Sequence, residues 1–188
     1  MKGRLFIFSG PSGVGKGTVR ARVLADTDNM SYSVSCTTRK PRPGDREGLD
    51  YWFISREDFL KQIEEGLFLE WADVHGNYYG TRRDIVEKTL NAGGDVMLEI
   101  DVQGALQIKK KMPEAITVFL MPPSFEELER RLRGRGTESE ESLRTRLANA
   151  KTEIACEPEY DHTIVNDTVD RAVEEFEQLI NSYRREQQ

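Results

Sequence analysis

Residues 5–16 read LFIFSGPSGVGK, an apolar run followed at once by a glycine-rich stretch that ends in lysine. The run Leu5–Phe8 predicts a buried parallel strand, because such strands are apolar on both faces. A helix is expected from about Lys16 to Asp26. Strand, glycine loop and helix in this order make the G-x-x-x-x-G-K pattern typical of a phosphate-binding loop, whose backbone N–H groups surround phosphate oxygens. The alternative interpretation is a glycine-rich turn with a solvated lysine.

The same alternation continues along the chain. Apolar runs at 96–100, 116–121 and 163–165 predict further buried strands, and a helical stretch follows each of them. The last helix begins after Asp167, which is its expected N-cap. Alternating strands and helices predict an α/β fold whose parallel sheet has helices on both faces.

Two segments interrupt this alternation. Residues 33–81 contain short aromatic strand-like runs around one helix, which predicts an inserted small mixed α+β subdomain. Residues 123–155 contain two helical stretches around a basic glycine-spaced turn, which predicts a helical insertion. We therefore expect a single domain with its core formed by residues 1–32, 82–122 and 156–188.

The composition excludes several classes of protein. The chain has 188 residues, 37% hydrophobic and 32% charged, which is ordinary for a globular domain and unlike a disordered chain. Its net charge of −6 argues against a nucleic-acid binder. No apolar run approaches the roughly 20 residues that cross a bilayer. The two cysteines form no metal or redox motif, and the apolar part of the N-terminus is too short for a signal peptide, so we expect a cytoplasmic protein without membrane contact.

Basic residues gather on a proline-stiffened loop at 35–44. Arg39 and Arg42 stand three residues apart there. Two guanidinium groups held in place suit the dianion of a phosphate monoester. The alternative interpretation is a solvated basic surface loop, as most charge runs are.

The phosphate loop departs from the usual pattern at one position. Gly17 stands where a serine or threonine normally supplies a Mg²⁺ ligand, and Thr18 comes one residue late. Either Thr18 contacts phosphate, or Mg²⁺ is held mainly by nucleotide phosphates and water, which suits an ion that dehydrates reluctantly.

Seven stretches of the chain together resemble the guanylate kinases of bacteria. The resemblance implies Mg²⁺-dependent transfer of the γ-phosphate of ATP to GMP and dGMP, which serves GTP and dGTP supply and GMP recycling. It also implies a P-loop kinase core with helices on both faces of its parallel sheet, a GMP-binding insertion at 33–81 and a helical lid at 123–155, in a monomer or a homodimer. The stretches are Gly10–Lys16, Ser35–Gly44, Glu70, Gly76–Thr81, Asp101–Gly104, Arg131–Gly136 and Val165–Asp167.

For GMP, the resemblance implies that a carboxylate and hydroxyl groups recognise guanine. The ring presents N1–H and the 2-amino group as adjacent donors, which one carboxylate accepts, while a hydroxyl can donate to O6. The residues implied for GMP are Glu70, Ser35 and Thr81 at the base, Arg39, Arg42, Tyr51 and Tyr79 at the phosphate, and Asp101 near GMP and the metal. Taken singly, the two tyrosines fit ordinary aromatic packing as well.

For ATP, the resemblance implies the phosphate loop, a lid arginine and an asparagine near the adenine. These residues are Gly10, Pro11, Ser12, Gly13, Val14, Gly15, Lys16, Gly17, Thr18, Arg135 and Asn166. The residues implied in catalysis, by neutralising charge, are Lys16, Arg39, Arg135 and Arg146. Arg131 and Arg133 are weaker lid candidates, and the role of Glu99 is left open. No dedicated set of metal ligands is predicted, although Thr18 and Asp101 could contact Mg²⁺ through water.

Two other classes of function compete with a kinase. A kinase-like domain that only binds protein partners typically loses phosphate-loop residues, whereas this chain keeps Gly15 and Lys16. A GTP-binding switch protein would carry an N-K-x-D motif, which the sequence lacks. Phosphoryl transfer to a phosphate needs no general base, and His75 and His162 lie in no catalytic pattern.

Overall fold

The computed structural model of the chain describes residues 1–74, 76–134 and 139–186. The strands are β1 (Leu5–Ser9), β2 (Met30–Tyr32), β3 (Cys36–Thr37), β4 (Trp52–Phe53), β5 (Phe68–Val74), β6 (Asn77–Arg82), β7 (Asp95–Glu99), β8 (Ile116–Met121) and β9 (His162–Val165). The helices are α1 (Lys16–Asp26), α2 (Arg56–Glu64), α3 (Arg83–Asn91), α4 (Val102–Lys111), α5 (Phe125–Arg133), α6 (Glu140–Ile154) and α7 (Val169–Arg185), with a 3₁₀ turn at Glu157–Glu159.

The chain divides into two compact units, which we describe separately. Unit 1 consists of Met1–Phe6, Asn29–Leu98 and Gln103–Ala115. Unit 2 consists of Ile7–Asp28, Glu99–Val102 and Ile116–Gln188.

The main sheet has the strand order β2-β7-β1-β8-β9. Strand β2 pairs in parallel with β7, and β8 pairs in parallel with β9. All five residues of β1 are buried, as expected for a strand of a parallel sheet with apolar side chains on both faces. The expected α/β fold with a parallel sheet is therefore confirmed.

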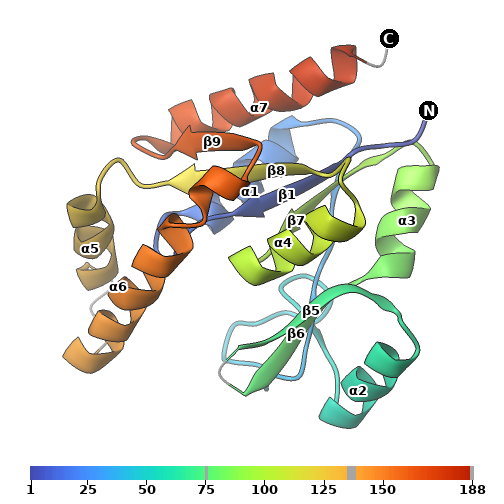
Figure 1. Cartoon of the computed structure of the whole chain (residues 1–188), viewed down its shortest axis with the longest axis horizontal. Helices are drawn as coiled ribbons and strands as arrows, with labels where there is room; N and C mark the ends of the chain where they lie inside the picture. Colours follow the sequence, from blue (N-terminus) through green and yellow to red (C-terminus); the bar gives the residue numbers. More distant parts are fainter. Residues whose placement is uncertain (75, 135–138, 187–188) are drawn as a thin grey trace. The chain divides into compact units, whose positions relative to one another are not determined.

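Unit 1 also contains a four-stranded sheet of order β4-β3-β6-β5. Figure 1 shows α2 beside the antiparallel strands β5 and β6. Helix α2 begins after Ser55, whose hydroxyl accepts the N–H of Asp58 as a cap. Its Phe59 stacks on Phe68 of β5 with ring centroids 4.3 Å apart, and both rings pack with Cys36. This small core fixes the register in which Glu70 of β5 lies opposite Thr81 of β6.

In unit 2, α1 and α7 pack together, and α7 also contacts β9 (Figure 1). Phe176 of α7 packs on Phe8 of β1 with ring centroids 5.1 Å apart. Helices α5 and α6 begin after Ser124 and Ser139, whose hydroxyls each accept a backbone N–H of the first turn.

The N-cap of α7 differs from the expectation. Thr168, not Asp167, caps the helix: its backbone is extended (φ −131°, ψ 145°) and its side chain accepts the N–H of Arg171. The Asp167 carboxylate instead accepts the N–H of Thr168 and pairs with the Arg171 side chain. Asp167 and Thr168 can both cap a helix, and this helix begins directly after Thr168.

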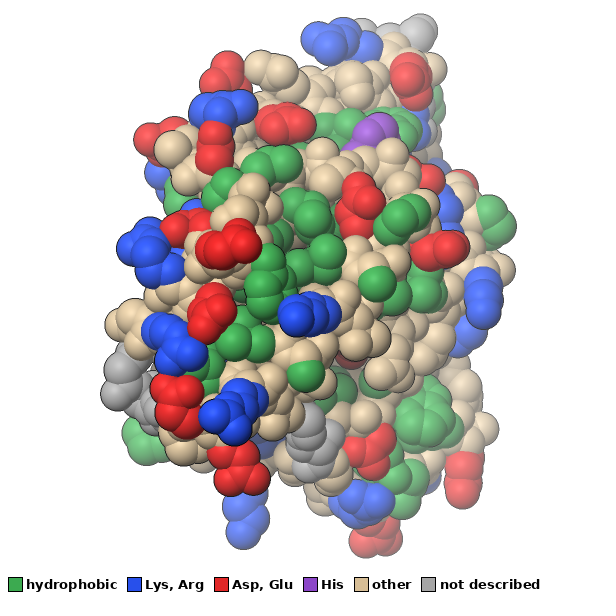
Figure 2. All heavy atoms as spheres, turned by 60° about the vertical axis from the view of Figure 1, so that its left-hand side comes forward, with side chains coloured by type: hydrophobic (Ala, Val, Ile, Leu, Met, Phe, Trp, Pro, Cys, Tyr) green, Lys and Arg blue, Asp and Glu red, His purple; other side chains and the backbone are tan. Residues whose placement is uncertain are grey.

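Acidic and basic side chains are interspersed on the face drawn in Figure 2. Helix α5 contributes such pairs: Arg130 and Arg131 both bond Glu127, and Arg133 bonds Glu129. Among the residues that the structure describes, no helix is long and apolar enough to cross a membrane.

Candidate active site

The phosphate loop connects β1 to α1, and both glycines of its G-x-x-x-x-G pattern have backbone angles that other residues rarely adopt. Gly10 has a φ of 152°, and a Cβ there would lie 2.5 Å from the carbonyl oxygen of Leu120. Gly15 has a φ of 102°, and a Cβ there would lie 2.7 Å from Nδ2 of Asn166. Any other residue would be strained at these backbone angles and would also collide with a neighbour. The G-x-x-x-x-G spacing thus matches two steric requirements of the loop.

The Lys16 ammonium bonds back onto its own loop. It donates to the carbonyl oxygens of Gly10 and, at 3.2 Å, of Pro11. Beside it lies a pocket of about 330 Å³ whose lining residues include Ser12, Gly13, Gly15, Lys16, Gly17, Thr18 and Glu99. A cavity with loop glycines, a lysine and a helix N-terminus on its walls has the chemistry of an anion site.

Glu99, whose role the sequence left open, lines this phosphate pocket. Its Oε2 lies 2.9 Å from Nη1 of Arg20 on α1. The ion pair supplies the carboxylate with a positive neighbour. Glu99 therefore adds a hard oxygen donor to the wall of the pocket.

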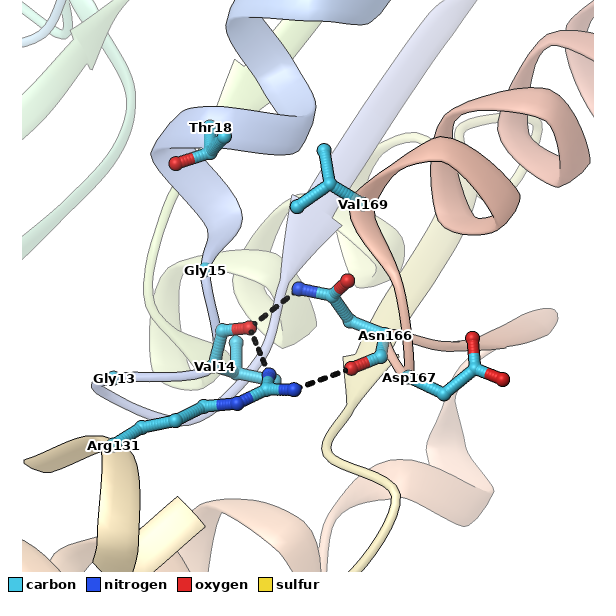
Figure 3. Close-up of a pocket in the computed structure, with 8 residues that line it drawn as sticks. All are labelled: Gly13, Val14, Gly15, Thr18, Arg131, Asn166, Asp167 and Val169. Atoms are coloured by element: carbon cyan, nitrogen blue, oxygen red, sulfur yellow. Dashed lines mark hydrogen bonds between the residues drawn. The ribbon is translucent and has the colours of Figure 1, made fainter. Parts of the chain in front are cut away.

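A second pocket, of about 280 Å³, shares Gly13, Gly15 and Thr18 with the first (Figure 3). Its lining includes Gly13, Val14, Gly15, Thr18, Arg131, Asn166, Asp167 and Val169. Asn166 is 3% exposed, and its Nδ2 donates to the carbonyl oxygen of Val14 at 2.7 Å. Because that bond needs the amide nitrogen, Oδ1 is the remaining group. This buried oxygen has no hydrogen-bond partner within the described part of the chain.

Arg131 spans the same pocket with its guanidinium group (Figure 3). Nη1 donates to the carbonyl oxygen of Val14 at 3.3 Å, and Nη2 donates to that of Asn166 at 3.0 Å. Glu127 holds Nε at 2.8 Å. A flat guanidinium fixed at all three nitrogens offers a planar surface on which a base could stack. From the sequence, Arg131 was a weaker lid candidate than Arg135. Helical spacing alone does not show which arginine side chain points toward the phosphate loop.

Helix α6 contacts the phosphate loop twice at one residue. Nη2 of Arg146 donates to the Ser12 hydroxyl at 2.7 Å, and Oε2 of Glu153 accepts the Ser12 N–H at 3.3 Å. Burial raises the pKa of the Glu153 carboxyl above its ordinary value, although Lys16 and the Ser12 N–H act in the opposite sense. The sequence analysis did not identify Glu153. A sequence signal for Glu153 was available: it follows Arg146 by about two helical turns and so lies on the same face of the helix.

In unit 1, a buried carboxylate and a buried hydroxyl form the predicted guanine-reading pair. Thr81 Oγ1 donates to Glu70 Oε1 at 2.6 Å, and their side chains belong to facing strands. Glu70 is 3% exposed and Thr81 is fully buried. Ser35 is also buried, and its carbonyl oxygen accepts the N–H of Trp52. A buried carboxylate has a high desolvation cost, so it favours further N–H donors.

Arg39 lies among the aromatic residues predicted for the GMP phosphate. Its guanidinium carbon lies 5.3 Å from the Tyr51 ring centroid, and the Tyr51 and Tyr79 centroids are 5.7 Å apart. Nη1 of Arg39 lies 2.9 Å from Asp45 Oδ2, which also accepts the backbone N–H of Arg42 at 2.7 Å. The Arg42 N–H and then the Arg39 guanidinium lower the pKa of Asp45 below its ordinary value. The loop thus already places one carboxylate, that of Asp45, against the Arg39 guanidinium.

For the remaining predicted residues, the structure gives a general location at most. The Arg42 side chain is exposed, and Asp101 belongs to unit 2, near enough to Glu153 to influence the pKa of that carboxyl. Arg135 lies outside the described residues. Within the described ranges, no group of three histidine, cysteine or acidic side chains could hold a metal ion.

Comparisons with known proteins agree on one family. The model of the guanylate kinase family matches residues 2–183. The guanylate kinase of Lactococcus lactis is 52% identical over 181 residues, which cover 96% of this chain and 88% of that protein. That of Thermotoga maritima is 48% identical over 184 residues, with 98% and 89% covered.

A solved structure gives the same result. The crystal structure of guanylate kinase from Anaplasma phagocytophilum superposes with a TM-score of 0.81 at 35% identity, covering 97% of this chain and 86% of that one. The phosphate loop of unit 2 and the Glu70–Thr81 pair of unit 1 lie within the matched residues. The chain belongs to the guanylate kinase family.

Proposed function

We propose that this chain, a nucleoside monophosphate kinase that uses ATP and GMP, also accepts dGMP, requires Mg²⁺ and serves GTP and dGTP supply and GMP recycling. The observation that carries the guanine assignment is the buried Glu70 carboxylate bonded to Thr81. A cytoplasmic location and a monomeric or homodimeric state stay predictions from the sequence.

The proposed base recognition follows from the donors of guanine. N1–H and the 2-amino group would both donate to Glu70, and a hydroxyl of Ser35 or Thr81 would donate to O6. Adenine lacks this pair of donors and would leave a buried carboxylate without compensation. A site built on such pairing can discriminate between bases by about 10⁴-fold. The deoxyribose of dGMP does not affect these groups.

For ATP, we assign the adenine to the pocket of Arg131 and Asn166. The buried Oδ1 of Asn166 is an acceptor, so it suits the 6-amino group of adenine and disfavours the O6 carbonyl of guanine. The Arg131 guanidinium would stack on the ring. The phosphates would then extend along the glycine loop toward Lys16.

The chemical step, as we propose it, uses alignment and charge without a general base. An oxygen of the GMP phosphate is already ionised at neutral pH and attacks the γ-phosphorus of ATP in line. Lys16 would exchange its bonds to loop carbonyls for phosphate oxygens, and Arg146 would exchange the Ser12 hydroxyl. Both exchanges replace a neutral acceptor by an anion, which strengthens the bond. Arg39 and Arg135 are the other arginines in this proposal.

The residues of the phosphate pocket fit a magnesium ion that keeps most of its water. Thr18 and Glu99 line the pocket and offer a hydroxyl and a carboxylate, the hard oxygen donors that Mg²⁺ prefers. Asp101 is a further candidate through water. When bound, Mg²⁺ would neutralise charge that develops on the β- and γ-phosphate oxygens.

A coupled assay tests this proposal. ADP formation from ATP is measured with GMP, dGMP, AMP, UMP and CMP as acceptors, each with and without excess chelator. We expect turnover with GMP and dGMP alone, and loss of that turnover when the divalent ion is removed. Equal rates with AMP would contradict the role of Glu70, and full activity in chelator would contradict the role of Mg²⁺.

A further inference from the structure

One peptide group of the phosphate loop has a charged side chain at each end. The peptide joins Pro11 to Ser12. The Lys16 ammonium donates to its carbonyl oxygen at 3.2 Å, and the Glu153 carboxylate accepts its N–H at 3.3 Å. A positive group at the oxygen and a negative group at the N–H both favour this one orientation of the peptide dipole.

The two charges come from different parts of unit 2. Lys16 begins α1, whereas Glu153 lies in the last turn of α6. Arg146, two turns earlier on α6, bonds the hydroxyl of the same Ser12 at 2.7 Å. One face of α6 therefore holds both the main chain and the side chain of a single loop residue.

Charged groups near the phosphate loop influence the ionisation of Glu153. Its side chain is partly buried, and Lys16 is the cation whose field favours the ionised form. Asp101 acts in the opposite sense, and Glu153 in turn influences the Tyr160 hydroxyl, as does Cys156. The carboxylate thus lies between the lysine and a second acid.

We propose that Glu153 is a positioning residue for Lys16: its carboxylate holds the Pro11–Ser12 peptide so that the Pro11 carbonyl faces the lysine ammonium. This inference rests on the proposed role of Lys16 in phosphoryl transfer. The Val14 N–H also donates to the Pro11 carbonyl oxygen, at 3.3 Å, so that end of the peptide keeps a partner when the charge of Glu153 is lost. The Ser12 N–H then loses its carboxylate partner, which loosens the orientation of the carbonyl that faces Lys16 before the nucleotide binds. Misplacement of a charge by about 1 Å can reduce turnover by about 100-fold.

The test compares four variants in steady-state assays. Glu153→Gln keeps the size and an acceptor oxygen but removes the charge, and Glu153→Ala removes both. Glu141→Gln is the matched control, because Glu141 is exposed on the same helix. Lys16→Met tests the role on which the inference rests. We expect kcat to fall about 10-fold in Glu153→Gln and about 100-fold in Glu153→Ala, with the KM for GMP unchanged.

A pH series separates positioning from a general loss of structure. As the pH falls toward the raised pKa of Glu153, the wild-type carboxyl becomes protonated and neutral like glutamine. The ratio of wild-type kcat to Glu153→Gln kcat should therefore approach one at acid pH and be largest at neutral and higher pH. Titration of the GMP phosphate affects both proteins equally and cancels in the ratio.

The outcomes are distinguishable. A ratio of one at every pH, together with an inactive Lys16→Met protein, would overturn the role of Glu153 alone. An active Lys16→Met protein would refute the proposed role of Lys16 and the inference with it. Thermal melts identify any variant that fails to fold, and if Glu153→Ala does so, the pH-dependent ratio of Glu153→Gln decides the question.

Discussion

The two units prepare for their ligands in different ways. In unit 1, the predicted guanine-reading groups are buried and bonded to each other, Glu70 to Thr81 at 2.6 Å. In unit 2, the charged groups Lys16 and Arg146 are bonded to neutral carbonyl and hydroxyl groups of the phosphate loop. The difference separates two tasks. A fixed, desolvated acceptor discriminates between bases, whereas cations that bond the phosphate loop itself lie where the phosphates of ATP would bind.

The largest expected effect concerns the lysine of unit 2. Lys16→Met keeps most of the apolar stem and removes the ammonium, so kcat should fall by roughly 100- to 1,000-fold, as it does when one preorganised charge-stabilising donor is lost. Binding of GMP should not change. Steady-state kinetics and GMP titration check this, with Lys110→Met, an exposed lysine of α4, as the control. Near-normal turnover in a folded Lys16→Met protein would refute the phosphate-loop assignment.

The second effect tests base recognition by unit 1. Glu70→Gln leaves one acceptor oxygen for two guanine donors. The free energy that stabilises the transition state with GMP should therefore decrease by about 1–3 kcal/mol, the cost of an unsatisfied buried donor, and kcat/KM for GMP should fall accordingly. The KM for ATP should stay as it is. Glu64→Gln, an exposed change on α2 of the same unit, is the matched control. Unaltered GMP kinetics would show that Glu70 does not read the base.

The third effect uses two adjacent arginines of α5. Both Arg130 and Arg131 bond Glu127, but only Arg131 also bonds the carbonyls of Val14 and Asn166. Arg131→Gln should raise the KM for ATP by about 2- to 30-fold, because it removes the guanidinium plane proposed to stack on the adenine, a contact of about 0.5–2 kcal/mol. Arg130→Gln should leave it unchanged. Equal effects of the two changes would remove Arg131 from the adenine pocket.

The smallest effect concerns the missing hydroxyl after the phosphate-loop lysine. A Cβ at Gly17 would meet no atom within 4 Å, so Gly17→Ser should fold normally. The new hydroxyl stands where phosphate loops usually carry a Mg²⁺ ligand. The Mg²⁺ concentration for half-maximal activity should decrease in a magnesium titration. An unchanged midpoint would indicate that the ion is held without a ligand at this position.

The sequence predicts elements whose signal is local. The run Leu5–Phe8 and the glycine spacing after it define β1, the loop and the start of α1, because each choice depends on neighbouring residues alone. The cap of α7 shows the limit of this reasoning. Asp167 and Thr168 are both good capping residues, and only the extended backbone at Thr168 decides between them.

The contacts of the site depend on long-range packing that no local pattern contains. Arg131 bonds the carbonyl of Val14, and Glu153 bonds the N–H of Ser12, across more than 100 residues of sequence in each case. The sequence predicted the arginine only as a weaker candidate for the lid. The glutamate was not recognised, because a single acid on a helix is usually solvated.

The most direct test of the account is a calorimetric titration of each nucleotide against each of two variants. The central claim is that different residues bind the two bases: Glu70 in unit 1 binds the guanine of GMP, and Arg131 in unit 2 stacks on the adenine of ATP. GMP should bind more weakly to Glu70→Gln and normally to Arg131→Gln, and a non-hydrolysable ATP analogue should show the reverse. If either change weakened both nucleotides equally, or if Glu70→Gln bound GMP as the unaltered protein does, the division of the two substrates between these residues would be wrong.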